Sequence, residues 1–220
     1  MRTGSWFSLV LAASILAPFA NARAEFFERG LEVAAGYVTG ELYLHDGTDA
    51  IWTRIRRAGI EYDERYGGGV TIGLIGGYAT VSQDQGARLA GNYLGVIGHI
   101  AAVSGGPATL SLGGRYLYQN LGDDNSTPPR TIDWQEWGLD SRLEYRVAGQ
   151  WTLAVGGRYD WVVADQLTKD LVATTATLKA QRHASRYLGL VFETDPGGFV
   201  AIALQRGMMD SSEIVFRRVY

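Results

Sequence analysis

The chain has 220 residues, no cysteine and a formal charge of −3, which excludes disulfide scaffolds, thiolate metal sites and a bulk charge suited to nucleic acid. Hydrophobic residues make up 46% and charged residues 20%, a balance too apolar for a disordered chain. Glycine is unusually frequent, with 29 residues. The three histidines, His45, His99 and His183, are far apart in sequence, so we expect no metal site and no cofactor.

The first 24 residues have the pattern of an export signal. Arg2 precedes an almost wholly apolar stretch from Trp6 to Ala20, and Ala22-Arg23-Ala24 fits a small-residue cleavage site. The apolar stretch is shorter than the ~18 residues of a spanning helix. We therefore predict a signal peptide over 1–24 and a mature domain over 25–220.

Apolar and polar residues alternate with a period of two from Leu31 onward, and no long helical stripe is present. In one example Trp137, Leu139 and Leu143 alternate with Glu136 and Asp140. Such alternation predicts strands with one apolar face and one face of small or charged residues.

Tight glycine-rich connections alternate with longer polar ones. The tight ones lie at Tyr66–Gly69, Ser104–Pro107, Ala148–Gln150 and Asp195–Gly198, where glycine supplies the positive φ of short hairpins. The pattern predicts an all-β, up-and-down antiparallel meander with both ends on one side. The predicted strands are ten, at 30–44, 50–65, 70–81, 90–103, 108–121, 132–147, 151–164, 172–194, 199–206 and 213–220; eight remain an alternative if 30–65 packs differently.

A soluble sheet sandwich accepts the same alternation, but three features favour a transmembrane barrel. Most strands reach the ~9–11 residues that a tilted strand needs to cross a bilayer. Charges of both signs lie at mid-strand on the face opposite the apolar one. Aromatic residues gather near strand ends, as in membrane-interface girdles: Trp52, Tyr62, Tyr66, Tyr116, Tyr118, Trp134, Trp137, Tyr145, Trp151, Tyr159, Trp161, Tyr187 and Phe199.

Strands such as Val70–Tyr78, together with the alternating connections and a C-terminal strand that ends at Tyr220, resemble the small outer-membrane β-barrel proteins of Gram-negative bacteria. These are the OmpA/OmpW-like barrels, and no motif identifies a subfamily. The resemblance implies an outer-membrane location, contact with outer-membrane lipid and lipopolysaccharide, and an insertion machinery that recognises Ile214, Phe216 and Tyr220. Arg218 departs from this terminal pattern, which is usually apolar there. We expect no nucleic-acid partner, and the oligomeric state stays open.

Closure is expected because a strand edge in hydrocarbon has no water to satisfy its backbone groups, so the last strand must pair with the first. The face that then points inward carries charges, which predicts either a network of ion pairs that plugs the lumen or a narrow polar channel. The predicted network consists of Arg57, Glu61, Asp63, Arg115, Glu136, Asp140, Arg142, Glu144, Arg146, Arg158 and Asp160.

An enzymatic alternative rests on His183, Ser185 and Glu193, which resemble the His-x-Ser pair and glutamate of outer-membrane lipid A deacylases of the PagL type. By that resemblance they are base, nucleophile and orienting group. Ser185 and Glu193 would lie about 26 Å apart on one extended strand, facing away from lipid. The leading hypothesis is therefore a non-enzymatic barrel, structural or a narrow passive channel, with surface binding or adhesion through the outer loops second and lipid hydrolysis third.

Overall fold

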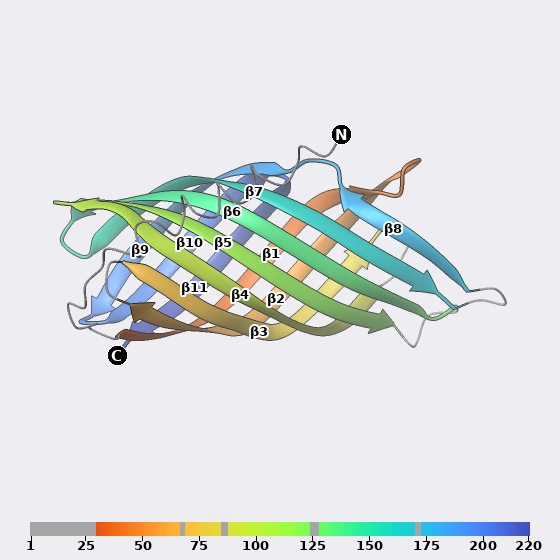
Figure 1. Ribbon diagram of the computed structural model, residues 1–220, viewed down its shortest axis with the longest axis horizontal. Coiled ribbons are helices and arrows are strands. Elements are labelled where there is room, and N and C mark those ends of the chain that lie inside the picture. The colour runs from red at the N-terminus through yellow and green to blue at the C-terminus, as the bar shows by residue number, and fades with distance from the viewer. Residues whose placement is uncertain (1–29, 67–68, 85–87, 124–127, 170–172) are drawn as a thin grey trace, which may run out of the picture.

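The computed structural model describes residues 30–66, 69–84, 88–123, 128–169 and 173–220, so the predicted signal segment lies outside the described residues. Within these ranges no helix is long and apolar enough to cross a membrane. The chain forms one antiparallel sheet that closes on itself (Figure 1). Its strands are β1 (Gly30–His45), β2 (Ala50–Tyr66), β3 (Val70–Gln83), β4 (Arg88–Gly105), β5 (Ala108–Asp123), β6 (Arg130–Ala148), β7 (Trp151–Thr168), β8 (Thr174–Ala180), β9 (Ala184–Asp195), β10 (Gly198–Gly207) and β11 (Met209–Val219).

The predicted fold class is confirmed: the sheet is a closed, up-and-down antiparallel barrel of ten strands, with β8 as an extra strand. The last strand pairs with the first, from Glu32 opposite Val219 to Leu42 opposite Met209. We call the end of the barrel where β1 begins and β11 ends the terminal end, on the left in Figure 1, and the opposite end the distal end.

Two predicted strand boundaries were wrong. The predicted strand 172–194 is two strands, because inward positions are even-numbered in β8 (Leu178, Ala180) and odd-numbered in β9 (Ser185, Tyr187), and the chain leaves the sheet at 181–183 to change register. The predicted loop 207–212 is a tight turn, so β11 begins four residues earlier than expected, at Met209.

β8 changes the number of strands between the two ends. It pairs with β7 from Thr174 to Lys179, and its last two residues pair with Leu44 and His45 of β1. The distal end is therefore closed by β1 to β8, eight strands, whereas the terminal end is closed by β1 to β7 and β9 to β11, ten strands. The barrel narrows toward its distal end.

The register fixes the tilt of the strands. Following paired residues from Thr39 through β2 to β6 reaches Leu167 on β7, whereas the opposite way round the barrel reaches Val155, twelve residues away on the same strand. A shear of twelve over ten strands gives a tilt of roughly 40°. The outward positions from Trp137 to Val147, which are apolar except for Ser141, then span about 25 Å along the barrel axis, the height of the apolar band of membrane barrels.

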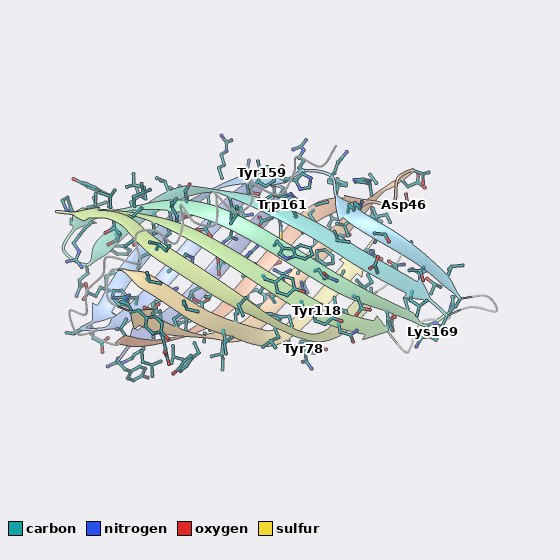
Figure 2. All side chains as sticks on the ribbon, in the orientation of Figure 1. Asp46, Tyr78, Tyr118, Tyr159, Trp161 and Lys169 are labelled. Carbon is teal, nitrogen blue, oxygen red and sulfur yellow. The ribbon has the colours of Figure 1, made fainter. Side chains whose placement is uncertain are left out.

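The outward face is an apolar belt edged by aromatic rings (Figure 2). Near its distal edge Tyr116 packs on Trp137, with 5.3 Å between ring centroids. Near its terminal edge Trp151 packs on Phe192 at 4.6 Å. Three of the aromatics expected in these girdles point inward instead: Trp134 is fully buried, and Tyr187 and Phe199 line the internal cavity.

The distal half of the lumen is filled with apolar side chains, which the sequence analysis did not predict. On β6 the polarity inverts along one strand: Trp134 points inward while Asp133 and Gln135 point outward, and after Glu136 the apolar residues are outside. We call the inward group the distal core; it consists of Leu42, Leu44, Ile55, Ala79, Val81, Leu89, Tyr93, Leu117, Leu121, Ile132, Trp134, Val162, Ala164, Leu178, Ala180, Met208 and Met209.

Inward-facing glycines make room for this filling. A Cβ on Gly40 would lie 2.6 Å from the sulfur of Met209, and a Cβ on Gly113 would lie 2.3 Å from the ring of His99. Both distances are shorter than real contacts, so these positions accept no larger residue without a shift of the neighbour. Part of the high glycine content therefore serves to fit large side chains into a narrow barrel.

Candidate functional site: the lumen

Glu136 on β6 is the centre of a buried charge cluster that adjoins the distal core on its terminal side. Its side chain is 2% exposed and contacts two arginines: Arg57 of β2 lies 2.7 Å from Oε2, and Arg115 of β5 bonds Oε1. The Nε of Arg57 also donates to Gln119 at 3.3 Å. Two guanidinium groups around one carboxylate satisfy a charge that burial would otherwise make costly.

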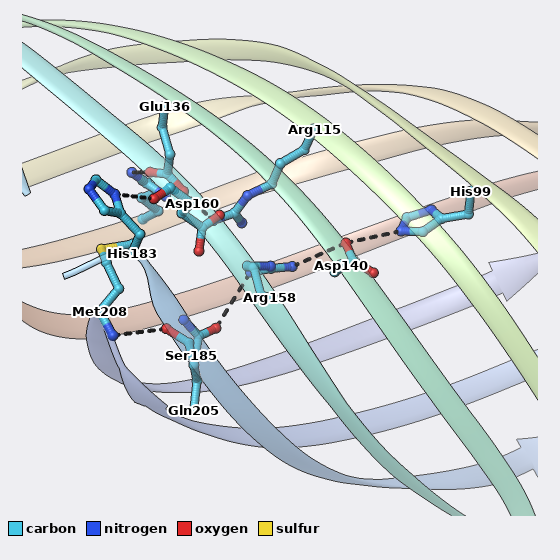
Figure 3. Close-up of polar contacts among 11 residues, drawn as sticks. His99, Arg115, Glu136, Asp140, Arg158, Asp160, His183, Ser185, Gln205 and Met208 are labelled. Carbon is cyan, nitrogen blue, oxygen red and sulfur yellow. Dashed lines mark hydrogen bonds and ion pairs between the residues drawn. The ribbon is translucent and has the colours of Figure 1, made fainter. Parts of the chain in front are cut away.

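The cluster continues across the lumen through β7 (Figure 3). Arg115 reaches the fully buried Asp160 at 3.4 Å. Arg158 lies 3.5 Å from the amide oxygen of Gln205 on β10 and 3.9 Å from Asp140. The same carboxylate lies 3.9 Å from Nε2 of His99, so polar contacts cross the lumen from one wall to the other.

The terminal half of the lumen is a cavity of about 560 Å³. Looser ion pairs line or border it: Arg142 with Glu144, Arg146 with Glu193 at 3.2 Å, and Glu32 with both Arg217 (2.7 Å) and Arg65 (3.2 Å). The wall formed by β9 and β10 is mostly small or apolar, with Gly189, Ala201 and Ala203. The cavity is thus lined by charged side chains on one side and by mostly small or apolar side chains on the other.

All eleven predicted network residues occupy inward positions, but nine of them form three groups rather than one network, and Glu61 and Asp63 lie apart from these groups. Arg57, Arg115, Glu136 and Asp160 are joined; Asp140 and Arg158 lie at longer distances; Arg142, Glu144 and Arg146 belong to the cavity wall. Glu61 lies 3.6 Å from Arg217, and Asp63 is buried with an oxygen that has no hydrogen-bond partner.

Six further inward-facing residues that take part in these contacts were not predicted as part of the network: Glu32, Arg65, Gln119, Glu193, Gln205 and Arg217. Each shares the inward parity of its strand, and that parity was the signal by which the sequence could have identified them. No group of three or more metal-ligating side chains is present among the described residues.

This arrangement places two barriers in series for a hydrated ion. In the charge cluster Glu136 is held by two arginines and Asp160 by one, and the distal core beyond it consists mainly of apolar side chains. An ion that loses its water there is poorly compensated for the desolvation cost. The lumen is therefore filled with side chains over its distal half and hollow over its terminal half.

The three residues of the hydrolase alternative are engaged elsewhere (Figure 3). Nδ1 of His183 lies 2.8 Å from the backbone oxygen of Asp160, and Oγ of Ser185 accepts a bond from the backbone N–H of Met208 at 3.0 Å. Glu193 pairs with Arg146. Among the described residues, the side chains of His183 and Ser185 are not hydrogen-bonded to each other, as a general base and its nucleophile would be.

The C-terminal residues Ile214, Phe216 and Tyr220 lie on the outward face, with Phe216 and Tyr220 exposed. Arg218, which departs from the apolar terminal pattern, shares their face and pairs with Asp195 at 2.9 Å. Asp195 neutralises the Arg218 charge at an outward position beside the apolar Phe216 and Tyr220.

No protein-family model matches the sequence, and no curated protein matches it. Solved structures match in shape. The translocator domain of the autotransporter NalP from Neisseria meningitidis aligns with a TM-score of 0.50 at 12% identity, over 97% of this chain and 95% of that one. An outer-membrane channel from Pseudomonas putida F1 aligns at 0.49, with 8% identity over 91% and 98%. The outer-membrane protease OmpT from Escherichia coli aligns at 0.46, with 11% identity over 90% and 97%. The similarity to NalP shows a fold of the outer-membrane β-barrel type, and the OmpA/OmpW resemblance stays a prediction.

Proposed function

We propose that the protein is a non-enzymatic outer-membrane barrel with a sealed lumen, structural rather than a conduit for solutes. The apolar belt of about 25 Å, edged by aromatic rings, supports insertion in a bilayer. The observation that carries the sealed state is the distal core, in which fully buried residues such as Trp134, Leu44 and Leu178 close the barrel where it narrows to eight strands.

Conductance in planar bilayers tests the proposal. Insertion of the purified barrel is scored separately by heat-modifiable gel mobility, and an open porin in the same bilayer serves as the positive control. We expect no discrete conductance steps from the inserted protein. Ohmic steps that disappear when the sample is heat-denatured would contradict the sealed lumen and favour the narrow channel.

The absence of an enzymatic role is part of the same proposal. It is supported by the separate engagement of His183, Ser185 and Glu193. Incubation with lipid A should release no 3-hydroxy acyl chains, and Ser185→Ala should leave that result unchanged. Acyl release by the wild type that Ser185→Ala abolishes would establish the hydrolase instead.

Binding at the distal end is the second candidate, favoured by the edge of β8. From Thr174 to Leu178 this strand is paired with β7 on one side only, since β1 reaches just Lys179 and Ala180. An unpaired edge without charge or proline accepts an added strand. Whole-cell binding that is lost when Thr175 and Thr177 are replaced by lysine would support this role; unchanged binding would exclude this edge.

A further inference from the structure

Two arginines face each other on the outer wall of the barrel. Arg186 of β9 and Arg206 of β10 are direct partners in the register, and both are exposed. Opposite residues on one face have Cβ atoms about 5 Å apart, and like charges in such a pair destabilise the sheet. The two positive charges on the wall therefore repel each other, and a bound anion would reduce this repulsion.

Among the residues that the structure describes, the guanidinium groups of Arg186 and Arg206 make no ion pair and no hydrogen bond. Two other outward arginines are neutralised: Arg54 pairs with Glu41 at 2.7 Å and Arg218 pairs with Asp195 at 2.9 Å. The pair on β9 and β10 differs from these two in being adjacent and without an ion-pair partner.

The carboxylates nearest along the wall are already engaged. Glu41 is held by Arg54, and Asp210 accepts a bond from the backbone N–H of Gly207 at 3.1 Å, within the β10–β11 turn. Neither acid makes an ion pair with Arg186 or Arg206 among the described residues, so both guanidinium groups keep their hydrogen-bond donors available to a ligand.

The pair lies at the distal edge of the apolar belt. The next outward residues toward the terminal end are Leu188 and Leu204, with exposed fractions of 53% and 58%. Beside the pair stand Tyr159 and Trp161 of the aromatic girdle, visible at the top of Figure 2. Aromatic girdles mark the level of lipid headgroups, so the two guanidinium groups sit where headgroup phosphates lie and the leucines where acyl chains begin.

The position opposite Arg186 on β7 leaves space for a ligand. It is Gly157, and a Cβ added there would meet nothing closer than 3.7 Å. The outer wall is thus indented between Tyr159 and Arg186. A headgroup can approach the guanidinium groups there without displacing a side chain.

We infer that Arg186 and Arg206 form a binding site for the phosphate of a lipid headgroup in the outer leaflet. The inference rests on the proposed membrane insertion of the barrel, with both chain ends on the periplasmic side and the distal end toward the outer leaflet. Two arginine forks match the geometry of a phosphate and donate charge-assisted hydrogen bonds to it, while Leu188 and Leu204 receive the first part of the acyl chain. The lipid relieves the repulsion that the free barrel carries.

Binding of three probes to the detergent-folded protein tests the site: lipid A with its phosphates, the same lipid A after dephosphorylation, and inorganic phosphate. Native mass spectrometry counts bound molecules. Arg186→Gln and Arg206→Gln should each weaken binding of phosphorylated lipid A about tenfold. Arg218→Gln, which alters an outward arginine at the terminal end, should leave it unchanged.

Melting without lipid gives an independent readout. Arg186→Gln should raise the melting temperature of the lipid-free barrel because it removes the like-charge pair, and phosphorylated lipid A should stabilise the wild type more than this variant. Equal binding of dephosphorylated lipid A, or full binding by the double variant, would overturn the inference. Saturation by inorganic phosphate as readily as by lipid A would overturn its assignment to a lipid.

Failure of this site and failure of the proposed function give different results. If the inference alone is wrong, wild type and variants insert equally into bilayers and bind phosphorylated and dephosphorylated lipid A equally. If the membrane assignment is wrong, none of them inserts, whatever the probe.

Discussion

The distal and terminal halves of this barrel share strands but have opposite distributions of polar and apolar side chains between the inner and outer faces. Over the terminal half the outer face is apolar and the interior is charged, with a cavity of about 560 Å³. Over the distal half the interior is apolar and close-packed, and polar residues such as Asp133 and Gln135 face outward. The inversion occurs within single strands, next to Glu136 on β6. The inversion supports the proposed membrane insertion, because a polar exterior over the distal half suits water and an apolar exterior over the rest suits lipid.

The largest expected effect separates two tryptophans on one strand. Trp134 lies in the distal core with 0% exposure, whereas Trp137 faces outward at 40%. Trp134→Ala should lower the free energy of unfolding by about 4 kcal/mol because it leaves a cavity. Trp137→Ala should cost at most about 1 kcal/mol, the scale of its ring contact with Tyr116. Denaturant unfolding of the detergent-folded protein measures both, and equal costs would contradict a packed distal interior.

The boundary between the halves is tested at Glu136. Glu136→Ala leaves Arg57 and Arg115 buried together without a counter-charge, so we expect a loss of about 3 kcal/mol in unfolding free energy. Asp140→Ala is the matched control on the same strand, since its contacts to His99 and Arg158 are 3.9 Å long, and it should cost clearly less. A larger loss of unfolding free energy for Asp140→Ala would show that Asp140, and not Glu136, is the main stabilising carboxylate of the cluster.

The tightness of the distal half can be measured with glycines of β1. Gly40→Ala places a methyl group 2.6 Å from the sulfur of Met209, whereas at Gly36 the nearest atom is 3.5 Å away. We expect Gly40→Ala to destabilise the barrel by about 2 kcal/mol through overpacking and Gly36→Ala to change little. In a Met209→Ala background the same Gly40→Ala change should cost clearly less; an equal cost there would show that Met209 is not the obstacle.

The smallest effect concerns the turn at the distal end of the β1–β2 hairpin. Hydrogen bonds from the backbone N–H groups of Asp49 and Thr48, and from the Thr48 hydroxyl, hold the pKa of Asp46 down at about 2. Because this pKa is lower than in the unfolded chain, the turn is stabilised above about pH 4, and the stabilisation disappears as pH falls through 2. NMR titration of the carboxyl group should show Thr48→Val raising the pKa; an unchanged value would mean that the hydroxyl contributes nothing.

The sequence was enough to predict the strands, their antiparallel order and the closure, because period-two alternation and glycine turns are local signals. It misplaced Trp134, since an aromatic residue near a strand end resembles a girdle residue. Its even parity, shared with Glu136, was the better guide. The break at 181–183 was missed although the parity changes between Ala180 and Ser185.

The contacts of the site were beyond the sequence for a physical reason. Arg57 and Glu136 meet across the lumen from β2 and β6, and the shear and the inward neighbours together decide which charges touch. Parity places a charge inside the barrel without fixing its height along the axis. The arginine and acid positions could therefore be listed, but not sorted into a tight cluster and a loose cavity wall.

The junction of β8 with β1 has a consequence for the order in which the chain folds. Closing the ten-stranded ring joins Glu32 to Val219, from nearly opposite ends of the sheet-forming chain, and such distant pairings form slowly. The rim contact of Leu44 with Ala180 needs only the first eight strands. Once made, it holds β1 beside the gap that the remaining three strands must fill, which shortens the search for the final partner.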